Sequence, residues 1–414
     1  MSDRLPLKTY LSAKNITRLF VALTITRLLI GCAAFKKELP ASPESALKKI
    51  SSFAYPLFFD DMAYDGLEHG IMQSLAYLQT VPADRRFRFG KDSFSTDHMV
   101  RSLEEFQSFI ENNPSQNALK KFIKTNFWVY QSIGRDSSRR VLFTGYYEPI
   151  IRGSRQKSEP YLFPVYARPD DLLTIDLSLF SPRFEGDKIT GRYTGDTVVP
   201  YYDRREIEQA GRMTENAEYL AWVKDRVDLF FLHIQGSGKI YLEDGKALNI
   251  HYHATNGRPY RSIGKLLIDE GKIARAEMSM QKIRAYLEEH PEEIEKVLYH
   301  NPSYVFFKVE EDGPLGYLDV KLTPARSLAV DRRIFPLPAL AFIETRQPLI
   351  TGDGDIDQWT DCRRFAVTQD TGGAIRGPGR ADLFWGNGPY AEIAAGHMQH
   401  MGKLYFLVLK PDRR

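Results

Sequence analysis

The 414-residue chain contains only two cysteines, Cys32 and Cys362, which excludes a disulfide framework and a zinc site built from four thiolates. It also lacks a charge excess of either sign, since 56 basic residues stand against 53 acidic ones without a sustained Lys/Arg stripe. This balance gives little support to nucleic-acid binding. No internal repeat or low-complexity tract is evident. With 43% hydrophobic residues the chain can bury a sizeable core, and its length predicts two or three domains.

The N-terminal segment carries an apolar stretch, residues 16–32, after a basic region. It is too short for a clean membrane span, and Arg27 interrupts it. Its end, Leu29 to Cys32, resembles a bacterial lipobox, in which the cysteine is lipidated after signal cleavage. The alternative is a frayed helix or a misassigned start site. We expect a lipoprotein signal over 1–32 with Cys32 as the anchor, and Ala33 after it, in place of aspartate, implies the outer membrane facing the periplasm.

Residues 42–133 show a helical pattern. Ser42 is suited to cap a helix that opens with Pro43. Apolar residues recur three or four apart over 97–114, which predicts one apolar helix face. A further helical stretch over 116–133 leads into the first strand region.

Short β-branched or aromatic runs bounded by Gly, Pro or Asp begin near residue 141 and predict strands. The runs before the next helical region are 140–151, 161–168, 227–238, 239–245 and 246–255. Asp244-Gly245 predicts a hairpin turn between the last two. Helical patterns return between 260 and 300. After 300 six short strands with glycine-rich links suggest a small closed barrel, and they are predicted at 303–310, 325–331, 339–345, 364–370, 381–386 and 403–410.

Three motifs in the C-terminal part carry a resemblance to a known family. They are "SLAVD" ending at Asp331, "TQDTGGAIRG" with Asp370, and "GRADLFWGNGP" with Asp382. In this order they resemble the three-aspartate domain of the membrane-bound lytic murein transglycosylase A family. Upstream segments such as "FTGYYEPIIRGS" and "VDLFFLHIQGSGKI" extend the resemblance over roughly 140–410. It implies a double-psi β-barrel on which the aspartates meet, and a lytic exotransglycosylase that acts on peptidoglycan.

The chemistry of glycosidic cleavage gives the aspartates distinct roles. An acid must protonate the leaving oxygen, and positive charge at the anomeric carbon must be managed. In a lytic transglycosylase the 6-hydroxyl of the muramic acid attacks its own anomeric carbon, so one carboxyl group can act first as acid and then as base. By resemblance that group is Asp382, and the apolar run 383–385 after it would raise its pKa. Asp370 and Asp331 would support it, although Asp370 before Thr-Gly-Gly is equally suited to cap a turn.

Polar residues upstream are candidates for binding sugar. Gln235 and Ser237 follow a predicted strand, and their amide and hydroxyl groups match sugar hydroxyls and N-acetyl groups. Within residues 143–147, Thr144 is a further candidate, and strand alternation leaves one tyrosine of the pair to stack on a sugar, for which we select Tyr147.

Metal and cofactor chemistry finds no support in the sequence. His251 and His253 lie two apart on one strand face, but no third ligand completes a zinc site, and ordinary strand residues are the better interpretation. A phosphate-binding glycine loop also fails, because neither P-loop nor dinucleotide spacing is present. No metal or organic cofactor is therefore implied.

The fold prediction is a mainly β protein with flanking helices, in which a double-psi β-barrel domain carries a second, inserted β-rich domain with a groove between them. The predicted parts are a signal peptide at 1–32, a helical part at 33–148, the inserted domain at 149–275 and the C-terminal barrel part at 276–414.

The functional prediction is cleavage of the β-1,4 bond between N-acetylmuramic acid and N-acetylglucosamine, with 1,6-anhydromuramic acid ends, in cell-wall turnover. Two alternatives stay open: a muramidase-type hydrolase on the same fold, and a non-catalytic peptidoglycan-binding lipoprotein. The expected partners are glycan strands, the outer membrane through a lipid anchor, and proteins of cell-wall synthesis or division.

Overall fold

The computed structural model describes residues 42–184, 186–209, 217–352 and 354–411. The lipobox prediction, with Cys32, lies outside these residues. Among the residues described, no helix has the length and apolar character needed to cross a membrane.

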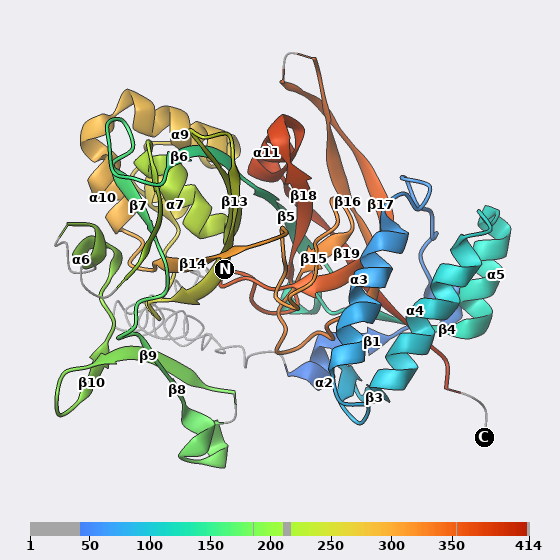
Figure 1. Cartoon of the computed structure of the whole chain (residues 1–414). Helices are drawn as coiled ribbons and strands as arrows, with labels where there is room; N and C mark the ends of the chain where they lie inside the picture. The colour runs from blue at the N-terminus through green and yellow to red at the C-terminus, as the bar shows by residue number, and fades with distance from the viewer. Residues whose placement is uncertain (1–41, 185, 210–216, 353, 412–414) are drawn as a thin grey trace, which may run out of the picture. The chain divides into compact units, whose positions relative to one another are not determined.

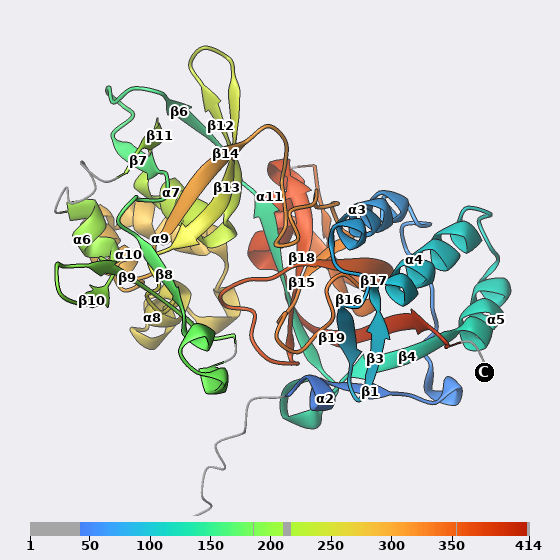
Figure 2. The same ribbon diagram turned by 60° about the horizontal axis from the view of Figure 1, so that its bottom comes forward.

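The central feature is a closed barrel (Figures 1 and 2). In the described part of the chain, the largest sheet has eight strands in the order β1-β4-β19-β16-β17-β15-β18-β5, and β5 also pairs with β19. This second pairing joins six strands into a ring: β5 (Val141–Glu148), β15 (Ser327–Ala329), β16 (Leu340–Ile350), β17 (Ile356–Asp370), β18 (Arg380–Asn387) and β19 (Gln399–Leu409). The strands β1 (Leu47–Lys49) and β4 (Phe127–Ser132) extend it beyond β19.

The predicted barrel is confirmed, with one strand exchanged. The run 303–310 was expected in the ring, but β14 (Val305–Glu310) pairs with β13 (Ala247–Thr255) in another sheet. Its place is taken by β5, which pairs in parallel with β18 and antiparallel with β19. A short apolar run specifies a strand but carries no information about its partner, which explains the error.

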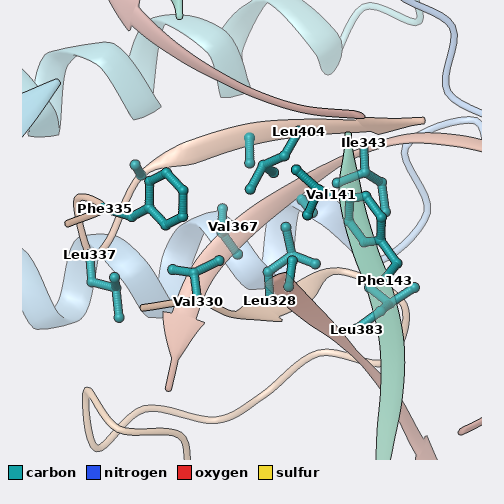
Figure 3. Packing of buried hydrophobic residues seen from close by; sticks show 14 of the residues in the cluster. Val141, Phe143, Leu328, Val330, Phe335, Leu337, Ile343, Val367, Leu383 and Leu404 are labelled. Carbon is teal, nitrogen blue, oxygen red and sulfur yellow. The ribbon is translucent and has the colours of Figure 1, made fainter. Parts of the chain in front are cut away.

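The barrel is filled by buried aliphatic and aromatic side chains (Figure 3). Phe143, Leu328 and Leu383 point inward from three neighbouring strands and are fully buried. Successive side chains of a strand point to opposite faces of the sheet. Thr144, next to Phe143, and Asp382, next to Leu383, therefore lie on the opposite face of the sheet. The alternation of each strand thus fixes the face on which the aspartate appears.

The second large sheet has the order β14-β13-β12-β6-β11-β7. Besides β14 its strands are β6 (Ile150–Ser154), β7 (Phe163–Tyr166), β11 (Tyr219–Val223), β12 (Ser237–Leu242) and β13 (Ala247–Thr255). The predicted Asp244-Gly245 turn joins β12 to β13, with Gly245 at φ 80°. The sheet reaches residue 310, past the boundary placed at 275, while the domain limits themselves remain predictions.

The run 227–238, predicted as a strand, is mostly helix α7 (Arg226–Gln235). The Asp225 carboxylate accepts backbone N–H bonds from Val227 and Asp228, and Gly236 ends the helix at φ 79°. Six of its residues are buried, so the helix is apolar on most sides and its sequence shows no helical periodicity. The cap residues on either side were the available indication.

The N-terminal helices were predicted with mixed success. The helix over 97–114 is confirmed as α4 (Thr96–Ile110). Ser42 caps α2 as predicted, but α2 (Pro43–Ala46) is a single turn followed by β1. The third stretch is helical only as α5 (Gln116–Asn126), because Phe127 onward adds strand β4 to the sheet.

The remaining elements surround the two sheets. The other helices are α3 (Leu67–Thr80), α6 (Arg204–Gln209), α8 (Ile263–Asp269), α9 (Met280–Glu289), α10 (Ile294–Tyr299) and α11 (Gly388–His397). The short 3₁₀ turns are η1 (Ser52–Ala54), η2 (Arg135–Ser137), η3 (Leu177–Leu179), η4 (Pro182–Phe184), η5 (Arg275–Glu277) and η6 (Pro291–Glu293). The small sheets comprise β2 (Arg86–Phe89) with β3 (Asp92–Ser95), and β8 (Leu173–Asp176) with β9 (Lys188–Tyr193) and β10 (Val198–Pro200).

Candidate active site

Two of the three predicted aspartates lie in one row across the barrel surface. Asp370 on β17 is opposite Ala329 on β15, and Ala329 is opposite Asp382 on β18. Asp382 is in turn opposite Thr144 on β5. Opposed residues of neighbouring strands share a face, and strands lie about 4.8 Å apart, so the Cα atoms of the two aspartates are about 10 Å apart. The structure thus brings Asp370, Asp382 and Thr144 together.

Asp382 is held through one of its two oxygens. Thr144 Oγ1 donates a hydrogen bond to Asp382 Oδ1, and Arg380 Nη2 lies 3.2 Å from the same oxygen. Arg380 Nη2 also donates to Thr144 Oγ1 at 3.0 Å, which closes a triangle of contacts. Oδ2 takes no part in this triangle, and the side chain is 18% exposed. The group is therefore oriented but still reachable.

The pKa of Asp382 is raised above its ordinary value. Burial disfavours the charged carboxylate, and this effect exceeds the opposing effects of the Arg380 charge and the Thr144 hydrogen bond. A carboxyl group in this state can hold a proton at a higher pH than a solvated one. The environment thus suits a general acid.

Asp370 combines the two roles that the sequence left open. Its Oδ1 accepts backbone N–H bonds from Thr371 at 2.8 Å and Tyr317 at 2.9 Å, so it does cap the turn that follows it. Burial nevertheless raises its pKa to about 6 against these bonds, and the negative charge of Asp382 adds to the rise. Asp370 is therefore both a turn residue and an electrostatic neighbour of Asp382.

Tyr146, rather than Tyr147, lies beside the aspartates. Tyr147 is 3% exposed, so its ring packs in the core and cannot stack on a sugar, which corrects our selection. The Tyr146 ring lies 5.2 Å from that of Phe384, and burial and the nearby charge of Asp370 raise the pKa of Tyr146. Its buried hydroxyl interacts with the Asp370 carboxyl group, which raises the pKa of Tyr146 further and opposes the rise in the pKa of Asp370. Alternation reduced the choice to one of the two but did not say which face β5 presents.

Asp331 serves the neighbouring loop. It is fully buried, and its carboxylate accepts bonds from Arg333 Nε at 2.9 Å and Nη2 at 2.7 Å, and from the Gly377 N–H at 2.8 Å. Burial alone would raise the pKa of Asp331, but these bonds hold it below its ordinary value. Asp331 thus stays ionised and holds the loop between β17 and β18.

Gln235 and Ser237 lie at the junction of the barrel with the second sheet. Gln235 ends α7, and its Oε1 accepts the backbone N–H of Tyr147 at 3.1 Å. Ser237 begins β12 and is 8% exposed. These contacts connect Gln235 to the last part of β5, and the sugar-binding role of both residues stays a prediction.

Arg380 and Tyr260 belong to this site but were not predicted. Arg380 stands two residues before Asp382, so strand alternation places both on one face, a pattern the sequence did offer. Tyr260 is 42% exposed. Burial raises its pKa, and the charges of Arg380 and Asp382 act on it in opposite directions. It comes from an irregular segment, for which no sequence pattern fixes a position.

The histidine pair lies on β13 of the second sheet, and a cavity lies beside the start of β19 in the barrel. His251 is buried and its Nδ1 accepts the Leu315 N–H at 3.3 Å, whereas His253 is exposed. No group of three potential ligands gathers anywhere in the described ranges. A cavity of about 620 Å³ is bordered by Trp359 and Gln399, and Gln399 is opposite Thr144 in the β19–β5 pairing.

Comparison with known proteins gives a consistent result. A family model described as the MltA specific insert domain matches residues 142–308, and a 3D domain model matches 326–408. The chain is 35% identical over 286 residues to membrane-bound lytic murein transglycosylase A of Escherichia coli K12, covering 68% of this chain and 70% of that protein. It is 32% identical over 284 residues to the protein of that name from Vibrio cholerae, covering 67% and 68%.

Solved structures agree with these matches. A membrane-bound lytic murein transglycosylase from Agrobacterium tumefaciens has a TM-score of 0.72 at 29% identity, covering 88% of this chain and 98% of that one. Escherichia coli MltA with bound chitohexaose has a TM-score of 0.69 at 26% identity, covering 91% and 97%.

Proposed function

The chain belongs to the membrane-bound lytic murein transglycosylase A family and is a peptidoglycan lytic transglycosylase, and we propose that Asp382 performs both proton transfers of its reaction. The bond cleaved joins C1 of N-acetylmuramic acid to O4 of N-acetylglucosamine. The observation that carries the proposal is a carboxyl group with a raised pKa whose protein contacts fall on one oxygen.

In the first step protonated Asp382 donates its proton to the glycosidic oxygen. The bond between C1 and that oxygen breaks, and N-acetylglucosamine leaves with a free 4-hydroxyl. Oδ2 is the proposed donor, because Thr144 and Arg380 occupy Oδ1.

In the second step the 6-hydroxyl of the muramic acid attacks its own C1 and gives its proton to the Asp382 carboxylate. This closes the 1,6-anhydro ring and restores the protonated acid, so no water is consumed. Nucleophile and electrophile belong to one sugar, which supplies a proximity advantage that a bound water would need the protein to provide.

Asp370 and Tyr146 are proposed to act on the charge that develops between these steps. An ionised Asp370 places negative charge two strands away from Asp382, across β15, on the face where the anomeric carbon becomes positive. The Tyr146 hydroxyl, which interacts with Asp370, is also available to a sugar hydroxyl. The exposed ring of Tyr260 is suited to stack on a sugar.

The wider setting is proposed on the same basis. The glycan lies between barrel and inserted domain, where Gln235, Ser237 and Thr144 contribute polar groups, and Asp331 keeps the 371–379 loop in place. Cys32 anchors the enzyme to the outer membrane, and its action there serves turnover of the cell wall together with synthesis or division proteins.

Mass analysis of digested sacculi tests the mechanism. The wild-type protein is expected to release muropeptides one water lighter than hydrolysis products. Asp382→Asn should lower the rate by about 10²–10⁴-fold while retaining sacculus binding, because only the proton donor is lost. Asp361→Asn is the matched control, since Asp361 is an exposed aspartate on β17 of the same barrel.

The outcomes separate the alternatives. Products with reducing ends would establish a muramidase, with Asp370 as the residue available to activate water, since Asp331 is buried and bonded to Arg333 and Gly377. No cleavage by the wild-type protein, with binding intact, would establish a glycan-binding lipoprotein. Unchanged anhydro products from Asp382→Asn would remove Asp382 from the mechanism.

A further inference from the structure

A second cavity, of about 220 Å³, has walls rich in arginine. We call it the arginine pocket after five of the residues that line it: Arg85, Arg86, Arg88, Arg332 and Arg333. No acidic residue is among those lining it. Its floor contains the buried apolar side chains of Leu318, Phe335 and Leu337.

Two segments distant in the sequence form these walls. On β2 the buried Phe87 and Phe89 alternate with exposed Arg86 and Arg88, so both arginines share the outer face of the hairpin. The other wall follows β15, where Arg332 comes directly after Asp331. The convergence therefore depends on the fold and was not visible in the charge pattern of the sequence.

Several contacts orient the guanidinium groups without neutralising them. Arg332 lies over the Tyr317 ring at 4.8 Å, and Arg85 lies over the Phe87 ring at 5.3 Å. Within the described residues, Arg333 is the one arginine of the pocket that is paired with a carboxylate, that of Asp331. The pKa of the neighbouring Arg376 is lowered by burial and by the charges of Arg333 and Arg332, against the opposing effect of the Asp331 charge. A pocket with oriented, mostly uncompensated arginines is suited to bind carboxylates or phosphates.

The pocket is physically linked to the active site. Tyr317 lines it, and the Tyr317 backbone N–H is the donor that holds Asp370. On the other wall Arg333 is bonded to Asp331, which holds Gly377 in the loop after Asp370. An extended peptide of five residues spans about 17 Å, which exceeds the separation of about 10 Å between the Cα atoms of Asp382 and Asp370.

We propose that the arginine pocket binds the carboxylates of the stem peptide carried by the muramic acid that the enzyme cleaves. The inference rests on the proposed function, because it assumes that this sugar sits at Asp382. Guanidinium groups pair with the peptide carboxylates, and the floor accepts small apolar side chains such as those of alanine. The enzyme thereby prefers strands that still carry peptides over stripped strands.

Kinetics on two substrates test the preference. The ratio of kcat/KM for peptide-bearing strands to that for strands stripped of peptide is measured for the wild type and for Arg88→Gln/Arg332→Gln. We expect the double variant to lower this ratio about tenfold, through a higher KM on the peptide-bearing strands. High salt should lower the wild-type ratio in the same way, because exposed charges are screened.

Three further measurements make the result specific. Arg152→Gln, at an exposed arginine of β6, should leave the ratio unchanged. The free stem tetrapeptide should bind the wild type and not the double variant in calorimetry, which tests the pocket even if no strand is cleaved. Vesicles containing anionic phosphatidylglycerol test a lipid surface as the alternative ligand.

The proposal is overturned if the ratio and the tetrapeptide affinity are the same in wild type and double variant. It is also overturned if the double variant loses only vesicle binding, which would assign the pocket to the membrane. Tetrapeptide binding without any anhydro product would contradict the proposed function and leave the pocket assignment standing.

Discussion

Two aspartate–arginine pairs, one beside the barrel and one on its strand β18, differ in the direction in which the pKa of the aspartate is shifted. Asp60 and Arg326 are both almost completely buried and form two parallel bonds, at 2.7 and 2.8 Å. Asp382 and Arg380 make one contact, at 3.2 Å. Burial acts on both carboxyl groups, yet the pKa of Asp60 is lowered and that of Asp382 is raised.

The difference lies in the number of donors. Besides Arg326, Asp60 accepts backbone N–H bonds from Met62, Tyr64 and Phe365, so both of its oxygens are satisfied. These bonds together outweigh the desolvation of the charge. Asp382 has its contacts on one oxygen, and there desolvation prevails. An arginine partner alone therefore does not decide whether an aspartate on this barrel is structural or reactive.

The largest effect on stability is expected at the buried pair. Arg326→Met leaves the Asp60 charge buried without its main partner, which should lower the free energy of unfolding by about 3–5 kcal/mol. Chemical denaturation measures this, and kcat of the folded fraction should not change. Arg363→Met is the control, since the exposed Arg363–Asp361 pair is worth about 0–1 kcal/mol. An equal loss of unfolding free energy in both variants would show that the Asp60–Arg326 pair has no special structural role.

A smaller effect on stability is expected at Asp370, where the substitution should stabilise the protein instead of destabilising it. Its folded pKa of about 6 lies above the ordinary value, so the folded state binds the proton more tightly and stability falls as pH rises through this window. Asp370→Asn should therefore stabilise the protein at pH 7.5 by about 1–3 kcal/mol, and by almost nothing below pH 4. Thermal unfolding at both pH values measures it. A loss of stability at pH 7.5 would show that the charged form is favoured.

The smallest expected effect is a shift in the pH profile. Arg380→Gln removes a positive charge that opposes the raised pKa of Asp382, so that pKa should rise further. Because the acid form is needed, the alkaline fall of kcat/KM should move to higher pH by up to about one unit. Arg152→Gln controls for net charge. If the alkaline fall of kcat/KM moved to lower pH instead, it would report the titration of a group other than Asp382.

How far the sequence predicts the fold depends on which contacts each feature needs. The aspartate motifs predicted the barrel, and period-two alternation along β18 accounts for the common face of Arg380 and Asp382. The presence of β5 in the barrel could not be predicted from the sequence. It depends on pairing between residues more than 230 positions apart in the chain, such as Thr144 and Asp382.

Local ambiguity explains the other errors. Helix α7 is apolar on most sides, so its sequence lacks the period that separates helix from strand. The choice between Tyr146 and Tyr147 required the direction in which β5 faces, which only its partners on both sides determine. The arginine pocket could not be predicted from the sequence because it depends on contacts between distant segments, β2 and the segment after β15.

The most direct test of the central claim is to follow the two aspartates in one titration. With ¹³C-labelled aspartate, the carboxyl resonances of Asp382 and Asp60 are assigned by their loss in Asp382→Asn and Asp60→Asn and are then followed with pH by NMR. The account predicts that Asp382 titrates above the ordinary aspartate range and Asp60 below it. Titration of Asp382 at or below the ordinary range would contradict its role as the proton donor.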